Sequence, residues 1–341
     1  MTKASHGPRR LDKQLLADLT DIVPRGIKFD VPLNELSRWR IGGRARVVVN
    51  ADCVEHIQAV TSLTTKHQCP LVVVGDSANL LFDSKGFEGV LLRLAGSLRD
   101  VRAVGRSILQ VGAGCSVDSL ADFAADCGLS GLEHIAGIPG TVGGLIAMNG
   151  GSQRRGIGSS VQVLDAVTRT GERVAIDQIS ADFGYRSSAF QTNGSVIAQA
   201  TLGLQVSKAN EVRASIASIR AERQRKFPSD EANCGSTFLS DPAMYDIIGP
   251  PGRAIEDAGL KGLRRGGAVI SRLHANFINN VGDATSDDVL WLVAAVQCRV
   301  EDRTGFAMKC EVRHVAADGI VRPADESAAE KWDASDFTFC Q

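Results

Sequence analysis

Hydrophobic and polar positions in the first third of the chain follow the short periods of strands and amphipathic helices. Apolar residues alternate with polar ones or form short continuous runs, which is typical of half-buried and fully buried strands. Around 53–67 they recur at helical spacing instead. The pattern therefore predicts a βαβ-like start, with strands at 47–49, 70–75, 89–94 and 108–114 and a helix at 53–67.

A second helix is predicted after Ser116, which suits an N-cap, and it ends at Gly128, which suits the C-terminal cap. Antiparallel strands follow at 161–170, 171–177 and 196–206. Beyond them the charge density rises in a helix that Pro228 ends, and this helix is the best candidate for a domain boundary.

The last third of the chain predicts a smaller α+β unit. Its strongest element is a helix that starts at Thr285 or Ser286, where Asp287 and Asp288 favour the helix dipole. The buried stripe of this helix is predicted to be Val289, Leu292, Val293, Val296 and Val300. A strand at 309–315 closes the fold, and the final 25 or so residues have the composition of an appended tail.

Charge and cysteine usage narrow the classes of function. Lys plus Arg number 38 and Asp plus Glu 39, so no global field favours nucleic acid or an anionic membrane. The polar start, broken by Pro8 and Pro24, is unlike a signal peptide, and no apolar run approaches the ~18 residues of a membrane span. The eight cysteines show no CxxC pair and no metal-ligand spacing. We expect a cytoplasmic protein without a metal site.

Three glycine-containing loops each adjoin a predicted strand: WRIGG at 39–43, GDSANLL at 75–81 and GIPGTVGG at 137–144. Such loops let backbone N–H groups converge on a phosphate or on the edge of a planar ring. None matches GxGxxG opening a helix or the P-loop, so a Rossmann or kinase-type site is not indicated. Taken singly, each loop is more often an ordinary tight turn. Their order along one chain is the specific signal.

That order resembles the flavin-binding half of the UDP-N-acetylenolpyruvoylglucosamine reductase family, which carries WxIGG, a GGGSNLL-type loop and a long glycine-rich motif. The last of these corresponds here to GLSGLEHIAGIPGTVGGLIAMNGG at 128–151. Further matching motifs follow in order: FGYRSSAF at 183–190, CGSTF at 234–238, AGLKG at 258–262, GGAVIS with HANFI at 266–278, and CEVRHV at 310–315. The resemblance covers about residues 28 to 316 and is to the family's shorter form, without an inserted substrate-covering loop.

The resemblance implies an α+β fold with a two-part FAD-binding domain of the vanillyl-alcohol-oxidase type and a smaller α+β substrate-binding domain. The expected divisions are a weakly structured leader at 1–27, FAD-binding subdomains at 28–98 and 99–218, a substrate-binding domain at 219–316 and a C-terminal tail at 317–341. From the charge balance and the lack of a long apolar run, we expect neither membrane insertion nor a nucleic-acid partner. Oligomeric state is left open, with a monomer preferred.

The reaction implied by the resemblance is the NADPH-dependent, FAD-mediated reduction of UDP-N-acetylglucosamine enolpyruvate to UDP-N-acetylmuramate, a step in peptidoglycan precursor synthesis. NADPH reduces FAD, and hydride then passes to the terminal methylene carbon of the enolpyruvyl ether. Negative charge develops on the adjacent carbon and carboxylate, so the protein must stabilise an enolate and donate a proton.

Three residues match the family's catalytic positions. Ser236 corresponds to the proton donor, although a serine in a Gly-Ser-Thr turn alone would more often cap the backbone. Arg186 corresponds to the arginine that contacts the substrate carboxylate, which a guanidinium binds bidentately. Glu311 corresponds to the glutamate that assists at the enol, although by strand alternation alone it would face solvent.

Binding residues follow by the same resemblance. FAD contacts are expected from Trp39, Ile41, Gly42, Gly43, Gly75, Asp76, Ser77, Ala78, Asn79, Leu80, Gly137, Ile138, Pro139, Gly140, Gly143, Gly144 and Asn149. Substrate contacts are expected from Tyr185, Lys226, Lys261 and His274, each of which could instead be a structural or solvated residue.

The chain departs from the family pattern in places. GGGSN has become GDSAN, which puts the Asp76 carboxylate where a diphosphate is expected. Leu239 replaces a lysine, and MKCEV replaces LEPEV, which removes a proline that would rigidify the approach to Glu311. These changes leave alternatives open: a paralogue acting on another nucleotide-linked enolpyruvyl sugar, a flavin oxidase of the same fold, or a binding protein that has lost turnover.

Overall fold

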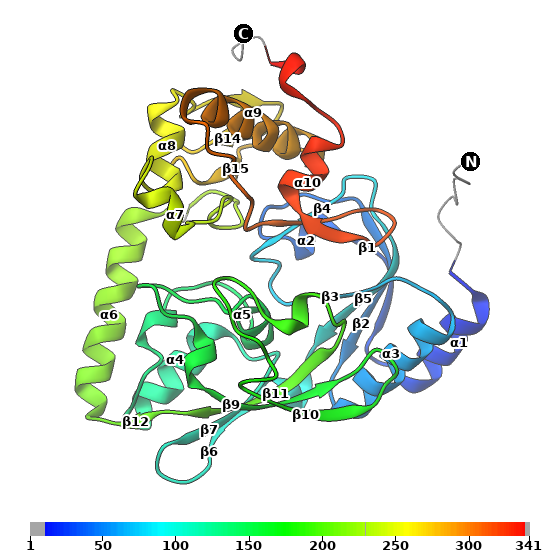
Figure 1. The fold of residues 1–341 in the computed structure, drawn as a ribbon. Helices are drawn as coiled ribbons and strands as arrows, with labels where there is room; N and C mark the ends of the chain where they lie inside the picture. Colours follow the sequence, from blue (N-terminus) through cyan, green and yellow to red (C-terminus); the bar gives the residue numbers. More distant parts are fainter. Residues whose placement is uncertain (1–10, 229, 338–341) are drawn as a thin grey trace. The chain divides into compact units, whose positions relative to one another are not determined.

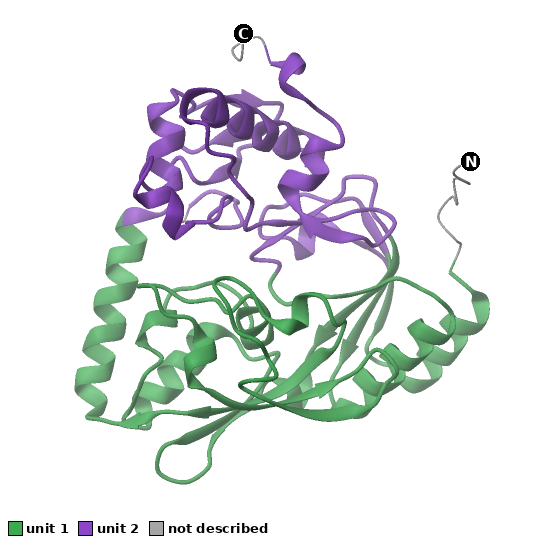
Figure 2. Ribbon diagram, in the orientation of Figure 1, with its two compact units in different colours: residues 1–29, 46–76, 88–225 green, residues 30–45, 77–87, 226–341 purple. Residues whose placement is uncertain are grey.

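The computed structural model describes residues 11–228 and 230–337, which form two compact units (Figure 2). Both units are assembled from segments that are separate in the sequence. Unit 1 comprises Met1–Phe29, Arg46–Asp76 and Glu88–Arg225, and unit 2 comprises Asp30–Ala45, Ser77–Phe87 and Lys226–Gln341. No helix in the described part of the chain combines the length and the hydrophobicity that crossing a bilayer requires.

Unit 1 contains two main sheets (Figure 1). The four-stranded sheet has the order β1-β2-β5-β3, and the five-stranded sheet has the order β10-β9-β11-β7-β6. β3 pairs parallel with β5, whereas the pairs of the second sheet are antiparallel. The strands are β1 (Ile27–Pro32), β2 (Arg44–Ala51), β3 (Leu71–Val73), β5 (Phe87–Leu94), β6 (Val101–Ala103), β7 (Ile108–Gly112), β8 (Leu129–Ser130), β9 (Val161–Val167), β10 (Arg173–Asp177), β11 (Val196–Gly203) and β12 (Gln205–Val206).

The helices of unit 1 close one apolar core with these sheets. α3 contacts α1, β9 and β11, while α4 and α5 contact one another. Ser116 caps α4 as expected, since its side chain accepts from the Ser119 N–H at 3.0 Å. The helices are α1 (Lys13–Ile22), α3 (Val54–Lys66), α4 (Val117–Asp126), α5 (Val142–Ala147) and α6 (Ala209–Lys226), the last of which leads into unit 2.

Unit 2 has its own core around α9. The Thr285 capping box starts α9 as predicted, and every residue of the predicted stripe is buried. Its two three-stranded sheets have the orders β13-β14-β15 and β17-β16-β4. The elements are α2 (Leu33–Leu36), β4 (Leu80–Phe82), α7 (Pro242–Tyr245), α8 (Pro251–Asp257), β13 (Arg264–Arg265), β14 (Ala268–Ile270), β15 (Ile278–Asn280), α9 (Ser286–Thr304), β16 (Arg313–Val315), β17 (Val321–Pro323) and α10 (Ala324–Ala329).

The described parts of the expected leader and tail, residues 11–27 and 317–337, contain helices and strands, while residues 1–10 and 338–341 lie outside the described residues. Asp12 caps α1, whose Leu15 and Leu19 are fully buried. Near the other end, β17 pairs with β16 and α10 packs on α9, with Ala324 and Ala328 fully buried. Short amphipathic helices with small apolar residues give a weak sequence signal, because their stability comes from packing rather than from propensity.

The unit boundaries also differ from the expected domain boundaries. α6 runs without interruption to Lys226, whereas a boundary was expected between 218 and 219. The segments 30–45 and 77–87 group with the C-terminal part of the chain: the Trp39 indole donates to the Ile278 carbonyl oxygen, and β4 pairs parallel with β16. A pairing between strands more than 200 residues apart has no local sequence signal.

His314 lies in β16 at the centre of a small buried polar group. It is 2% exposed, its Nδ1 lies 3.0 Å from Ser327 Oγ, and its Nε2 lies 3.6 Å from Asp83 Oδ2. Burial lowers the pKa of His314, which the nearby Asp83 carboxylate opposes only in part. Burial likewise lowers the pKa of His134, which is 2% exposed in unit 1. Both rings are therefore neutral in the folded protein at pH 7.

We expect the free energy of unfolding to decrease as the pH falls below about 6.5, the ordinary pKa of histidine in an unfolded chain. Below that pH the unfolded chain binds protons that the buried rings do not bind. The free energy of unfolding then falls by up to about 1.4 kcal/mol per pH unit for each histidine. Urea titrations between pH 7 and pH 5 would measure the effect. His314→Gln should have a shallower pH dependence than the wild type, whatever its stability at pH 7. An unchanged slope would show that His314 does not contribute.

Candidate functional site

The loop 137–144 in unit 1 is held by side chains from two helices. The Gly137 N–H donates to Asp118 Oδ1 of α4 at 2.9 Å, and Arg223 Nε of α6 donates to the Gly137 carbonyl oxygen at 3.1 Å. Gly137 has a φ of 71° and Gly140 a φ of 136°, values that side chains rarely tolerate. Apart from the buried Val142, the residues of this loop are partly buried or exposed. The N–H groups of Val142 and Gly143 donate to the Cys115 and Ala113 carbonyl oxygens, so the loop is fixed as well as partly exposed.

Gly75 meets the same loop within unit 1. A Cβ at Gly75 would lie 2.3 Å from Thr141 Oγ1, which caps α5. A Cβ at Gly143 would lie 2.9 Å from Ala113 Cβ. A larger residue at either position would require these neighbouring atoms to move. Gly75, at the start of the GDSANLL loop, thus packs closely against the loop 137–144 within unit 1, and we call Gly75 and residues 137–144 the glycine cradle.

The residues after Gly75 accommodate the departures from the family pattern. Ser77 adopts a φ of 55°, where glycine is the usual residue, and its Oγ donates to the Leu36 carbonyl oxygen at 3.1 Å. The Asp76 side chain is exposed. Asn79 Nδ2 donates to the carbonyl oxygen of Glu311 at 2.9 Å. The expected diphosphate loop is therefore tied directly to the backbone of an expected catalytic residue.

The WRIGG motif lies in unit 2 and is anchored there by buried side chains. Trp39 is fully buried, and its indole N–H donates to the Ile278 carbonyl oxygen at 2.7 Å. A Cβ at Gly42 would lie 2.7 Å from Leu33 Cβ, and one at Gly43 would lie 2.5 Å from the Gly86 nitrogen. Trp39 and the equally buried Ile41 thus anchor the loop by packing, while the two glycines let neighbouring segments approach it.

Tyr185 and Arg186 occupy the tip of a tight turn in unit 1. Gly184 and Ser187 close the turn with reciprocal backbone hydrogen bonds of 3.0 and 3.3 Å. Arg186 has a φ of 53°, its Nη2 donates to a backbone carbonyl oxygen in the 128–151 motif at 3.1 Å, and its guanidinium lies 5.8 Å from the centre of the Tyr185 ring. Asn149 Nδ2 donates to the Gly184 carbonyl oxygen at 2.7 Å. The side chain of Asn149, expected to contact FAD, thus holds this turn.

Ser236 and Glu311 come together in unit 2 through their backbone. The Glu311 N–H donates to the carbonyl oxygen of Thr237, the residue after Ser236, at 2.8 Å. Phe238 and Cys310 form an antiparallel bridge beside it. Gly235 has a φ of 78°, which fixes the sharp bend that precedes Ser236. Two motifs about 75 positions apart in the sequence are thus neighbours.

The expected substrate contacts in unit 2 include a cationic and aromatic group. The rings of Phe227, His274 and Phe277 lie 5.1 to 5.4 Å apart, and Lys226 Nζ lies 5.8 Å from the Phe227 ring. Burial and the nearby Lys226 charge lower the pKa of His274, so its ring is neutral. Lys261 pairs with a carboxylate of α8 at 2.8 Å. These side chains offer positive charge and a flat apolar surface.

Several supporting residues had no signal in the sequence. Asn276 is 2% exposed and uses both groups of its amide on Phe238, accepting from its N–H at 2.9 Å and donating to its carbonyl oxygen at 3.0 Å. Its position beside His274 in the HANFI motif was the available clue. Thr141 and Arg223 support the glycine cradle in the same indirect way. Their role depends on contacts that no local pattern encodes.

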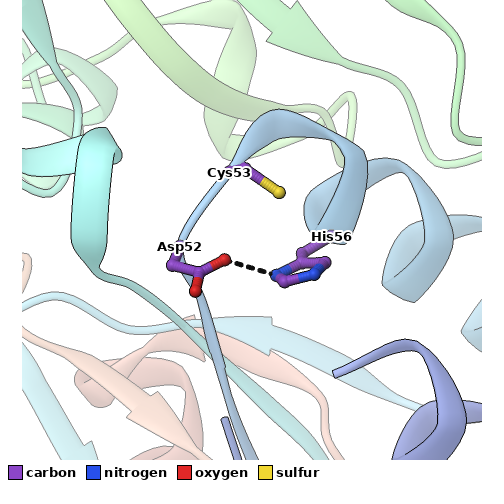
Figure 3. Close-up of side chains that lie close together, drawn as sticks. All are labelled: Asp52, Cys53 and His56. Atoms are coloured by element: carbon purple, nitrogen blue, oxygen red, sulfur yellow. Dashed lines mark ion pairs between the residues drawn. The ribbon is translucent and has the colours of Figure 1, made fainter. Parts of the chain in front are cut away.

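Asp52, Cys53 and His56 form a separate cluster at the start of α3 (Figure 3). Their carboxylate, thiol and imidazole ligand atoms lie within 4.8 Å of one another, and His56 Nδ1 pairs with Asp52 Oδ1 at 2.7 Å. Burial raises the pKa of the Cys53 thiol, so the thiol is protonated at neutral pH. A carboxylate beside a helix N-terminus is stabilising without a metal ion. We assign this cluster a local structural role.

The glycine cradle fits a flavin dinucleotide. Residues 137–141, 143 and 144 of its longer loop are at least partly exposed, so a diphosphate or a ring edge can reach the loop. A model of the FAD binding domain matches residues 45–177. The fold and this loop system therefore define a flavin-dependent oxidoreductase with an α+β architecture.

Comparison with known proteins narrows the class to one family. A model described as the C-terminal domain of UDP-N-acetylenolpyruvoylglucosamine reductase matches residues 227–315. UDP-N-acetylenolpyruvoylglucosamine reductase 1 of Corynebacterium glutamicum is 47% identical over 303 residues, which cover 89% of this chain and 90% of that protein. The reductase of Rubrobacter xylanophilus is 35% identical over 84% of this chain and 95% of its own length. The chain belongs to the UDP-N-acetylenolpyruvoylglucosamine reductase family.

A solved structure agrees with this assignment. The UDP-N-acetylenolpyruvylglucosamine reductase of Thermus caldophilus superposes with a TM-score of 0.72 at 29% identity. The match covers 84% of this chain and 98% of that chain. The recognition of the family and of its fold from sequence motifs is therefore confirmed.

We expect Asp76→Asn to strengthen FAD binding only modestly, by no more than about fivefold at low ionic strength. An exposed carboxylate repels a diphosphate through water, which is worth at most about 1 kcal/mol and is screened by salt. Flavin fluorescence titrations of the apoprotein at low and high salt would measure the change. A larger gain that persists at high salt would mean that Asp76 faces the diphosphate directly.

Proposed function

We propose that the protein catalyses the NADPH-dependent reduction of UDP-N-acetylglucosamine enolpyruvate to UDP-N-acetylmuramate in the cytoplasm, as a step of peptidoglycan precursor synthesis. The observation that carries the proposal is the pairing of the Ser236 turn with the segment that contains Glu311 through the Thr237–Glu311 hydrogen bond. Family membership supports the same reaction, since two relatives named as this reductase match the chain over 90% and 95% of their own length.

In this reaction FAD supplies hydride that originates from NADPH. The residues of the chain have the remaining tasks. Arg186 binds the carboxylate of the enolpyruvyl group, because a guanidinium is permanently charged and binds two carboxylate oxygens at once. Glu311 assists the enol that forms as charge develops, and Ser236 delivers the proton to the neighbouring carbon.

The cationic and aromatic group around Lys226, Phe227 and His274 binds the nucleotide part of the substrate. Lys226 offers a charge for the diphosphate, while the neutral His274 and the Phe227 ring offer apolar surface and an imidazole nitrogen. Asn276 N–H donates to His274 Nδ1 at 3.3 Å, which leaves the proton on Nε2. His274 is therefore oriented as a hydrogen-bond donor. Lys261 and Tyr185 complete the proposed substrate contacts.

The anaerobic absorbance spectrum tests this function most directly. We expect NADPH to bleach the bound flavin and UDP-N-acetylglucosamine enolpyruvate to restore its colour, because the two half-reactions are separable in time. A flavin that bleaches but is not restored by this compound would refute the substrate. Other enolpyruvyl ethers, and oxygen as a competing oxidant, serve as controls.

We expect Ser236→Ala to leave the reduction of flavin by NADPH nearly unchanged while slowing reduction of the substrate by about 10²-fold or more, as for a lost general acid. Stopped-flow measurement of each half-reaction would separate the two. Ser240→Ala, four positions along the same segment, is the matched control. Wild-type rates in Ser236→Ala would remove Ser236 from this role.

A further inference from the structure

The backbone around Glu311 is held by segments from elsewhere in unit 2. Its N–H donates to the Thr237 carbonyl oxygen at 2.8 Å, and its carbonyl oxygen accepts from Asn79 Nδ2 at 2.9 Å. One residue earlier, Cys310 forms the bridge with Phe238. The hydrogen bonds of that bridge use the peptide groups on either side of Cys310, so the Cys310 N–H points away and needs another acceptor.

That acceptor is a carboxylate from α10. Asp325 Oδ1 lies 2.9 Å from the Cys310 nitrogen. The ladder between β16 and β17 first continues by one more bond, from the Ala324 N–H to the Val312 carbonyl oxygen at 2.9 Å. At Asp325 the backbone is already part of α10. The Asp325 side chain, rather than its backbone, therefore accepts the next hydrogen bond, from the Cys310 N–H.

The Cys310 end of this bond is buried, while Asp325 is partly exposed. Cys310 is 5% exposed, and burial raises the pKa of its thiol well above the usual range, with the Asp325 charge acting in the same direction. A buried N–H that loses its acceptor is not readily satisfied by water. Pro323 is the N-cap of α10 and makes no side-chain capping bond. The Asp325 carboxylate accepts a hydrogen bond from the Cys310 peptide N–H.

We propose that Asp325 is a positioning residue for Glu311: by fixing the peptide at Cys310 it sets the direction in which the Glu311 side chain leaves the backbone. This inference rests on the proposed function, in which Glu311 acts on the substrate. Asp325 lies beyond the residues 227–315 that the C-terminal domain model matches. The hydrogen bond supplies the local restriction that the missing proline of the MKCEV segment would otherwise give.

The test compares Asp325→Ala with Asp325→Asn, which retains an oxygen acceptor. We expect Asp325→Ala to slow reoxidation of the reduced flavin by UDP-N-acetylglucosamine enolpyruvate by about tenfold or more, as small displacements of a reacting group do. Reduction of the flavin by NADPH should be unchanged, and Asp325→Asn should retain most of the wild-type rate. Asp318→Ala is the matched control, because Asp318 Oδ1 also accepts a backbone N–H, from Ile320, but does not touch the Glu311 segment.

Hydrogen–deuterium exchange provides a readout without turnover. Peptides that cover 309–313 should exchange about tenfold faster in Asp325→Ala than in the wild type, with little change in Asp318→Ala. Wild-type exchange in this segment, or an equal loss of both half-reactions, would overturn the positioning role. If the wild type itself does not reduce the substrate, the proposed function fails, while the exchange comparison still decides whether Asp325 fixes this segment.

Discussion

The hydrogen bonds that surround Glu311 are the constraint on which the proposed active-site half in unit 2 depends. The peptide groups from Cys310 to Arg313 are satisfied by three separate segments: the Ser236 turn through Thr237, the loop after Gly75 through Asn79, and the C-terminal segment through Asp325 and Ala324. Buried peptide groups must be paired, so a displacement of any one segment leaves an unsatisfied group beside Glu311. The requirement couples the proposed catalytic residue to a proposed cofactor loop and to the C-terminal segment around α10.

A different constraint shapes the proposed cofactor loops of unit 1. There the close packing of neighbouring segments determines which residues the loops can contain, because Gly75 and Gly143 approach their neighbours more closely than a Cβ allows. Side chains from α4 and α6 then fix the loop that results, through Asp118 and Arg223. Close approach and rigid support together fix a partly exposed loop, which is the loop we propose for the cofactor. In unit 2, Ser77 departs from the glycine pattern without losing the turn, since its hydroxyl donates to a backbone carbonyl oxygen.

Helices with strong caps and wide apolar stripes were predictable from the sequence alone. α9 begins at the Thr285 capping box and buries the expected stripe, and α4 begins at Ser116. The ends of the chain were not predictable in this way. α1 and α10 are short, and α10 packs through small alanines, so their stability comes from tertiary contacts with α3 and α9. A helix of this kind resembles a polar tail until its partner is known.

The sequence by itself determined the family, the α+β class and the identity of the loops. Glycines with special backbone conformations and long ordered motifs can be recognised from short stretches of consecutive residues. Only the tertiary structure decided which residues act through others. Asn149 holds the Tyr185–Arg186 turn, Asn79 holds the backbone of Glu311, and Asp325 holds the peptide before it. These roles depend on hydrogen bonds between positions far apart in the sequence, and the partner of a polar side chain is fixed only when the fold brings its acceptor within reach.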